Sequence, residues 1–225
     1  MGTRRTPGFV SNTGMKSPIS PAILEVKSLN FGYPGHALFS QWSASLPPGV
    51  SLVLGGDGRG KTTLLRLLAG ELVASAGELV INGLSLTTHA KEYRQRVFWI
   101  EPRTLAFDQM TPAVFFDLRR GAYAGFDDRT LSRYVDGLAL GPDLDKQLFM
   151  LSTGSRRKVW LAAAFASGAA LTLLDMPFAA LDRASIVCVL SMLNEVAAHP
   201  ERTFVVADYT APVGVLLAAT IDLGG

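Results

Sequence analysis

The chain has 225 residues, 48% hydrophobic and 18% charged, a balance that excludes general disorder and allows a large buried core. Lysine and arginine number 21 against 19 aspartate and glutamate residues, and a formal charge of +2 gives no reason to expect a nucleic-acid partner. Cys188 is the only cysteine, which excludes an intramolecular disulfide and a cysteine-rich zinc site.

The first 20 residues mix arginine, proline, glycine, serine and threonine, and they contain no apolar run of the length that a secretory signal needs. We therefore expect a flexible leader at residues 1–20, followed by one domain at residues 21–225. The most apolar stretch, residues 160–174, is shorter than the roughly 20 residues that span a bilayer, and Ser167 and Gly168 interrupt it.

The first third of the chain predicts strands followed by a helix. Residues 23–31 alternate loosely between apolar and polar side chains, and residues 38–46 form a second strand that ends at a Pro-Pro-Gly turn. Residues 50–54 are a short apolar run that leads into a glycine-rich loop, after which leucines recur at helical spacing over residues 61–72. Further strands are predicted at residues 78–81 and 97–100.

Helical and strand patterns alternate in the second half of the chain. Helices are predicted at residues 112–120, 130–138, 158–166 and 184–197, buried strands at residues 170–174 and 203–207, and a brief terminal strand at residues 221–223. We assign residues 103–165, approximately, to an inserted helical subdomain. The alternation after residue 50 favours an α/β fold with a mostly parallel sheet that helices cover.

The loop after residues 50–54 has a phosphate-binding pattern. It reads Gly55-Gly56-Asp57-Gly58-Arg59-Gly60-Lys61-Thr62, which fits G-x-x-x-x-G-K-[ST], and Thr63 follows. Glycines let backbone N–H groups turn around phosphates, and the following helix adds its positive N-terminal end. Lys61 is expected to reach the β- and γ-phosphates and Thr62 to bind Mg²⁺, whereas Asp57 adds an unhelpful negative charge. A glycine-rich turn with a lysine by chance is the alternative, which the strand–loop–helix order disfavours.

A second acidic position follows an apolar strand. Asp175 ends the run Leu-Thr-Leu-Leu-Asp, and in phosphate-loop proteins such an aspartate holds Mg²⁺, often through water. The alternative is an aspartate that caps the end of a buried strand. A run so apolar seldom tolerates a charge without a counter-ion, and the presence of Lys61 and Thr62 favours the metal-binding interpretation.

A third motif indicates which family of phosphate-loop proteins the chain resembles. Residues 151–155 read Leu-Ser-Thr-Gly-Ser and lead through Arg-Arg-Lys into a predicted helix, which resembles the Leu-Ser-Gly-Gly-Gln signature of ATP-binding cassette (ABC) proteins. Residues 177–182 resemble the family's dimer-contacting loop, and residues 77–83 resemble the strand after its first helix. Tyr33 matches the aromatic residue that stacks on adenine. The basic run at residues 156–158 is predicted to be a solvated face.

The resemblance to the ABC nucleotide-binding domain implies a fold and a mode of assembly. The fold is a P-loop NTPase core with a mostly parallel sheet, an N-terminal antiparallel β-subdomain and the inserted helical subdomain. Two such domains enclose two ATP molecules with Mg²⁺, each held by the phosphate loop of one subunit and the signature of the other. Ser152 and Gly154 are then expected to contact the γ-phosphate across the interface, although Thr153 and Ser155 replace the usual glycine and glutamine.

Three positions depart from the family pattern. Met176 stands where the family has a glutamate general base; a thioether cannot accept a proton from water, and losing general-base catalysis lowers the rate by about 10²–10⁴-fold. Asp208 stands at the position of the switch histidine and would bring negative charge toward the γ-phosphate. Glu101 replaces a glutamine and can still bind Mg²⁺.

The residues for ATP binding are thus kept, whereas the groups for hydrolysis are lost. We expect an ATP-binding subunit of a membrane transporter, cytoplasmic and peripheral on the inner face of the cell membrane, with weak or absent hydrolysis at its own site. Its implied partners are a multi-span membrane subunit and a second nucleotide-binding domain, and the one-sided loss favours a heterodimer over a homodimer. A non-hydrolysing nucleotide-sensing or scaffold module in a soluble complex fits the same substitutions and is the alternative.

Overall fold

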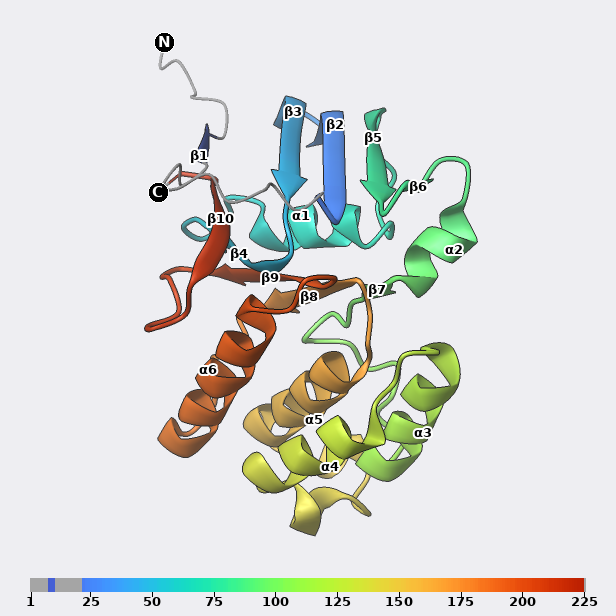
Figure 1. Cartoon of the computed structure of the whole chain (residues 1–225), viewed down its shortest axis with the longest axis vertical. Coiled ribbons are helices and arrows are strands. Elements are labelled where there is room, and N and C mark those ends of the chain that lie inside the picture. The colour runs from blue at the N-terminus through green and yellow to red at the C-terminus, as the bar shows by residue number, and fades with distance from the viewer. Residues whose placement is uncertain (1–7, 11–21, 225) are drawn as a thin grey trace.

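The computed structural model describes residues 8–10 and 22–224 and consists of two β-sheets with helices between and below them (Figure 1). The predicted leader, residues 1–20, lies mostly outside the described residues. Its described part, β1 (Gly8–Val10), pairs antiparallel with β10 (Leu217–Asp222) at the edge of one sheet. Within the described part of the chain, no helix is both long enough and apolar enough to cross a membrane.

The smaller sheet has four antiparallel strands in the order β3-β2-β5-β6. Its strands are β2 (Leu24–Tyr33), β3 (His36–Leu46), β5 (Ala76–Ile81) and β6 (Leu84–Ser85). Inward-facing apolar residues alternate with exposed ones along β3, as expected for a sheet with one covered face. This sheet confirms the predicted antiparallel β-subdomain.

The larger sheet has six strands in the order β1-β10-β4-β9-β8-β7, and all pairs except β1 with β10 are parallel. Its central strands are almost fully buried apolar runs, as both faces of a parallel sheet are covered. Because the strands are parallel, their carboxyl ends lie along one edge, where ligands bind in such folds. The strands not yet given are β4 (Gly49–Leu54), β7 (Val97–Phe98), β8 (Leu171–Asp175) and β9 (Thr203–Asp208).

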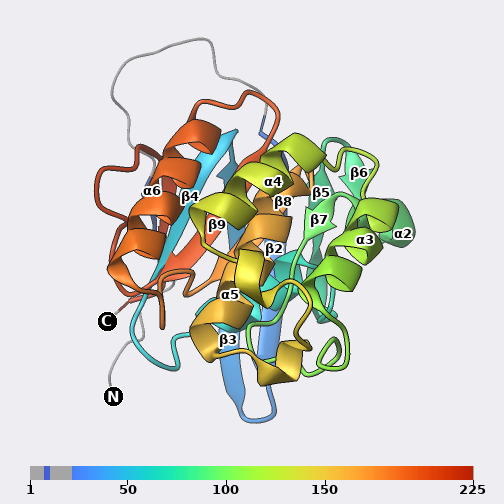
Figure 2. The same ribbon diagram turned by 90° about the horizontal axis from the view of Figure 1, so that it is seen from below.

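Helices separate the two sheets and cover the lower face of the larger one (Figure 1). α1 lies between the sheets and contacts β8 and β9, whereas α6 contacts β4 and α5 contacts α3, α4 and α6. Figure 2 shows α5 and α6 on the same face of the larger sheet. The helices are α1 (Lys61–Leu68), α2 (Ala90–Gln95), α3 (Pro112–Ala122), α4 (Asp128–Gly137), α5 (Thr153–Ala166) and α6 (Arg183–Ala197), with short 3-10 helices η1 (Gly141–Asp143) and η2 (Leu148–Met150).

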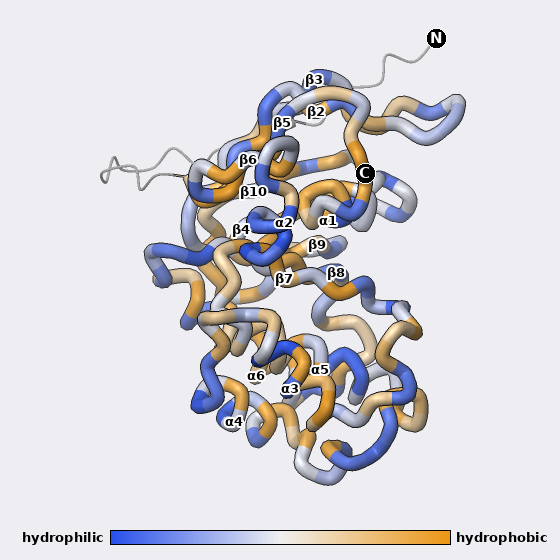
Figure 3. Tube along the Cα trace, turned by 90° about the vertical axis from the view of Figure 1, so that its right-hand side faces the viewer, coloured by the Kyte–Doolittle hydropathy of each residue, from blue (hydrophilic) through white to orange (hydrophobic). Residues whose placement is uncertain are grey.

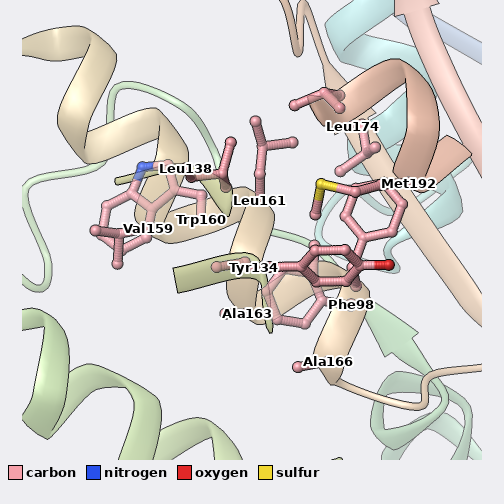
Figure 4. Packing of buried hydrophobic residues seen from close by; sticks show 14 of the residues in the cluster. Phe98, Tyr134, Leu138, Val159, Trp160, Leu161, Ala163, Ala166, Leu174 and Met192 are labelled. Atoms are coloured by element: carbon pink, nitrogen blue, oxygen red, sulfur yellow. The ribbon is translucent and has the colours of Figure 1, made fainter. Parts of the chain in front are cut away.

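Two hydrophobic clusters follow from this layering. One surrounds α1 between the sheets, where Figure 3 shows hydrophobic stretches, and the other fills the space around α5. Small residues such as Ala163 and Ala166 let α5 pack closely, and larger side chains such as Tyr134 and Met192 fill the rest (Figure 4). The two clusters fix the helices against the larger sheet and so hold its carboxyl edge in place.

Candidate functional site

A cavity of about 520 Å³ opens at the carboxyl edge of the larger sheet. The loop after β4, the residues after β7, β8 and β9, and the end of β2 all contribute to its walls. It brings together most of the predicted site residues: Tyr33, Gly56, Asp57, Gly58, Arg59, Gly60, Lys61, Thr62, Thr63, Glu101, Asp175 and Met176. Gly55 adjoins it, whereas Ser152 and Gly154 lie outside it at the start of α5.

Glycines shape the loop between β4 and α1. Gly60 directly precedes α1 with a φ of 91°, and a Cβ there would lie closer than 3.0 Å to the side chain of Leu38. Gly58 also has a positive φ, 68°. Left-handed conformations favour glycine, so the pattern of the motif meets a local backbone requirement and leaves the N-terminal end of α1 facing the cavity.

Lys61 is buried against this loop, with 7% of its surface exposed. Its Nζ donates hydrogen bonds to the carbonyl oxygens of Gly55 at 2.6 Å and Gly56 at 2.8 Å. The same ammonium group lies 4.2 Å from the ring centroid of Tyr209. The positive charge is therefore held at the loop, where the phosphates of a nucleotide would be bound.

Thr62 and Asp175 form a direct contact between the start of α1 and the end of β8. The Thr62 hydroxyl donates a 2.6 Å hydrogen bond to Oδ2 of Asp175. Burial raises the pKa of the Asp175 carboxyl, while the Thr62 hydrogen bond and Lys61 oppose that shift. A hydroxyl and a carboxylate oxygen side by side are hard oxygen ligands, and they fit a Mg²⁺ ion that also binds phosphate oxygens.

Tyr33 lies at the end of β2, at the rim of the cavity. Its side chain is 46% exposed, and the ring makes an edge contact with Phe31 at 5.2 Å between centroids. Its hydroxyl lies 3.2 Å from Oγ1 of Thr63. The hydroxyl contact and the Phe31 contact orient an exposed aromatic ring beside the loop, an arrangement suited to stacking on a base.

Met176 and Glu101 also line the cavity. Met176 follows β8 with a φ of 49°, a sparsely populated conformation for a residue other than glycine, and its N–H donates to the carbonyl of Ala207 at 2.9 Å. Met176 lines the cavity, as does Asp175, which precedes it in the chain. Glu101 is exposed in the cavity wall, and its charge contributes to the raised pKa of Asp175.

Asp208 ends β9 and is only 8% exposed. Burial raises the pKa of its carboxyl, which accepts a 2.7 Å hydrogen bond from the N–H of Tyr209. Asp208 is not one of the cavity-lining residues, and the side chain that faces the loop from this strand is that of Tyr209. Tyr209 was not among the predicted site residues, although its position two residues beyond the predicted strand at residues 203–207 was a usable signal.

The basic run on α5 is not the solvated face that was expected. Arg157 lines the cavity and donates to the carbonyl oxygen of Ala179, and its partial burial lowers the pKa of the guanidinium. Arg156 pairs with Asp108 at 3.2 Å. Lys158 pairs with Asp182 at 2.8 Å. The run therefore connects the start of α5 to surrounding loops, because each of its cations has a partner within the chain.

Ser152 and Gly154 have structural roles at the start of α5. The Ser152 side chain caps the helix by accepting a 3.0 Å hydrogen bond from the N–H of Ser155. Gly154 is buried, and a Cβ there would lie closer than 3.0 Å to the carbonyl oxygen of Ala180. The packing of this chain alone therefore requires a glycine at position 154, independently of any contact with a partner.

Replacing Gly154 with alanine is expected to lower the free energy of unfolding by about 1–3 kcal/mol, because the new methyl group overpacks against a backbone carbonyl. Urea denaturation of the purified chain measures this change. Gly121→Ala, in α3, is the matched control, since a Cβ there meets nothing within 4 Å. We expect that control to leave stability unchanged or raise it by up to about 1 kcal/mol. Equal stability of the two variants would contradict the prediction.

Comparison with known proteins gives consistent matches. The sequence profile of the family described as ABC transporter matches residues 39–179. The chain is 30% identical over 184 residues to the cytochrome c biogenesis ATP-binding export protein CcmA of Pseudomonas savastanoi pv. phaseolicola, covering 81% of this chain and 85% of that protein. It is 27% identical over 179 residues to the ABC-type transporter ATP-binding protein EcsA of Bacillus subtilis, covering 77% and 72%.

The fold has matches among solved structures. A structure described as the ATP binding subunit of an ABC transporter superposes with a TM-score of 0.73 at 24% identity, covering 82% of this chain and 79% of that chain. The profile match contains Lys61, Ser152 and Asp175, whereas Tyr33 and Asp208 lie outside it. The roles expected for these two positions therefore depend on their place in the fold, Tyr33 at the end of β2 and Asp208 at the carboxyl end of β9.

Proposed function

The chain belongs to the ABC transporter family as an ATP-binding subunit, and we propose that it binds MgATP in the cavity but hydrolyses it weakly or not at all. Lys61 would bind the β- and γ-phosphates, and Thr62 and Asp175 would hold Mg²⁺. Tyr33 would stack on the adenine ring. When bound, Mg²⁺ would neutralise negative charge on the phosphates.

The position of Met176 is the observation that carries the proposal of weak hydrolysis. Met176 lines the same cavity as Lys61 and Asp175, directly after the strand that supplies the aspartate. Sulfur in a thioether has no proton-accepting strength near neutral pH, so a water molecule beside it is not activated. Glu101 is exposed in the cavity wall, and we assign it to metal binding.

We propose that the partner in the nucleotide-bound dimer is a different ABC subunit with its own general base. Ser152 is exposed at the N-terminal end of α5, where its hydroxyl and the helix dipole would face a phosphate group held by that partner. In such a heterodimer, one site hydrolyses ATP and the site on this chain binds it. A homodimer would have Met176 in both sites.

We place the contact with a multi-span membrane subunit on α3 and the neighbouring loops, at the inner face of the cell membrane. On α3, Val114 and Leu118 are 51% and 42% exposed, one helical turn apart, whereas Phe115 and Phe116 are buried in the core. Other exposed apolar side chains of the helical region are Leu105, Phe149 and Met150. An apolar surface of this kind suits a protein partner.

The proposal is tested by binding and capture. A fluorescent ATP analogue is titrated into the purified chain with and without Mg²⁺, and phosphate release is followed on the same samples. We expect saturable, Mg²⁺-dependent binding with negligible phosphate release. Capture from detergent-solubilised membranes is expected to recover a multi-span protein together with a second ABC subunit. Recovery of soluble proteins alone would instead support the nucleotide-sensing or scaffold function, and an absence of binding would overturn the proposal.

A further inference from the structure

A three-residue contact lies across the phosphate loop. Tyr209, just beyond β9, places its ring over the ammonium group of Lys61 at 4.2 Å and donates a hydrogen bond from its hydroxyl to the carboxylate of Asp57. All three side chains line the cavity. The contact therefore joins the end of β9 to the loop after β4 on the side where phosphates would bind.

The Lys61 ammonium group already has partners within the chain on the side of the phosphate loop. Two of its three N–H bonds are directed to the carbonyls of Gly55 and Gly56, and the aromatic face of Tyr209 provides the third interaction. Phosphate oxygens must replace at least some of these partners before Lys61 can bind them. Binding of a nucleotide thus competes with interactions that the chain makes with itself.

Core packing does not require this contact. Tyr209 is 46% exposed and Asp57 is exposed, so neither side chain is held there by burial. The hydrogen bond to Asp57 raises the pKa of the Tyr209 hydroxyl, which keeps it protonated as a donor. The aspartate carboxylate has a second effect, since its negative charge lies beside the site of the phosphates. The hydrogen bond that holds Tyr209 over Lys61 and the negative charge of Asp57 both oppose nucleotide binding.

We propose that Tyr209 and Asp57 form a latch over the phosphate loop that sets the nucleotide affinity of this site. The inference rests on the proposed function, because the latch competes with the phosphates of the nucleotide. The closed latch covers Lys61, and only molecules in which it has opened bind phosphates at full strength. The apparent Kd therefore equals the intrinsic Kd of the open form divided by the fraction of molecules in which the latch is open.

The opposite role for Tyr209 is that its hydroxyl screens the charge of Asp57 and so assists nucleotide binding. The two roles predict opposite signs for Tyr209→Phe, which removes the hydroxyl and keeps the ring. A latch predicts tighter binding in this variant, because the loop opens more readily. A screening hydroxyl predicts weaker binding, because the Asp57 charge is left unpaired beside the phosphates.

The experiment is a double-mutant cycle in the full chain with Tyr209→Phe, Asp57→Ala and the double variant. The affinities for MgATP and MgADP are measured by titration with fluorescent analogues. We expect Tyr209→Phe to tighten binding about threefold to tenfold in the wild-type background, as expected for the loss of one exposed competing contact. In the Asp57→Ala background, the same change is expected to have no effect. Tyr134→Phe, which removes a hydroxyl bonded to Glu195 on α6, is the matched control outside the cavity.

The outcomes separate the latch from the proposed function. Weaker binding or unchanged binding in Tyr209→Phe overturns the latch while the wild-type chain still binds MgATP. An equal effect of Tyr209→Phe with and without Asp57 also overturns it, because the two residues would then act independently. If neither the wild type nor any variant binds nucleotide, the proposed function fails, and the latch fails with it.

Discussion

Replacing Met176 with glutamate is expected to raise the rate of ATP hydrolysis by about 10²–10⁴-fold, the usual contribution of a general base. Met176 already lines the cavity and directly follows Asp175, so a glutamate of similar length would line the same wall. A single-turnover measurement of phosphate release with excess protein isolates the chemical step from product release. The wild-type chain is expected to show a rate close to that of the solution without protein.

Met176→Gln is the matched control, because glutamine has the length of glutamate but cannot accept a proton at neutral pH. The rate of this variant is expected to stay near that of the wild type, while its affinity for MgATP is retained. Brisk hydrolysis by the wild-type chain that depends on Lys61 would contradict this account. Another side chain in the cavity would then supply the base, and Glu101 would be the first to test.

Lys61→Ala is expected to weaken MgATP binding by about 2–5 kcal/mol, or roughly 30-fold to several thousand-fold. The lysine is buried at the loop with its ammonium group fixed by two carbonyls, so no other cation can move into its place without changing the loop. Titration with a fluorescent ATP analogue measures the loss. The folded state is checked on the same sample by circular dichroism.

Lys91→Ala, on the exposed surface of α2, is the control for a lost lysine charge far from the loop. Its affinity for MgATP is expected to match that of the wild type. Comparable weakening in both variants would mean that long-range charge governs binding, and raising the salt concentration would then reduce it further. Unchanged binding in Lys61→Ala would place the nucleotide elsewhere on the chain.

Much of the sheet could be predicted from the sequence because its central strands are buried on both faces. β4, β8 and β9 read as short continuous apolar runs, and each end of the predicted strands lies within one residue of the observed end. α2 and β6 were missed for a physical reason. α2 has six residues and buries only Tyr93, so it shows no helical periodicity to detect.

Helix ends were less predictable than helix existence. α5 begins at Thr153 rather than residue 158, because Ser152 caps a polar first turn that precedes the apolar residues. α1 ends at Leu68 rather than residue 72, because Gly70 takes a left-handed conformation with a φ of 71° just beyond it. The start of α5 is thus set by a side-chain cap and the end of α1 by a left-handed glycine, and neither boundary follows from hydrophobic spacing.

The candidate site was predictable where a motif is local and unpredictable where it depends on strand register. Lys61 and Thr62 belong to one continuous pattern, and their position in the cavity follows from it. The contact of Tyr209 with Asp57 joins residues 152 positions apart and exists because β4 and β9 are paired in parallel, with Leu54 opposite Asp208. No spacing within the sequence indicates that pairing.

The first turns of α5 and the loop after β8 are joined at three points. Gly154 packs against Ala180, Arg157 donates to the carbonyl of Ala179, and Lys158 pairs with Asp182. These contacts join the start of α5, which overlaps the signature-like residues 151–155, to the predicted dimer-contacting loop at residues 177–182. A displacement of either segment is therefore expected to move the other, and Arg157, which lines the cavity, belongs to both the joined region and the site.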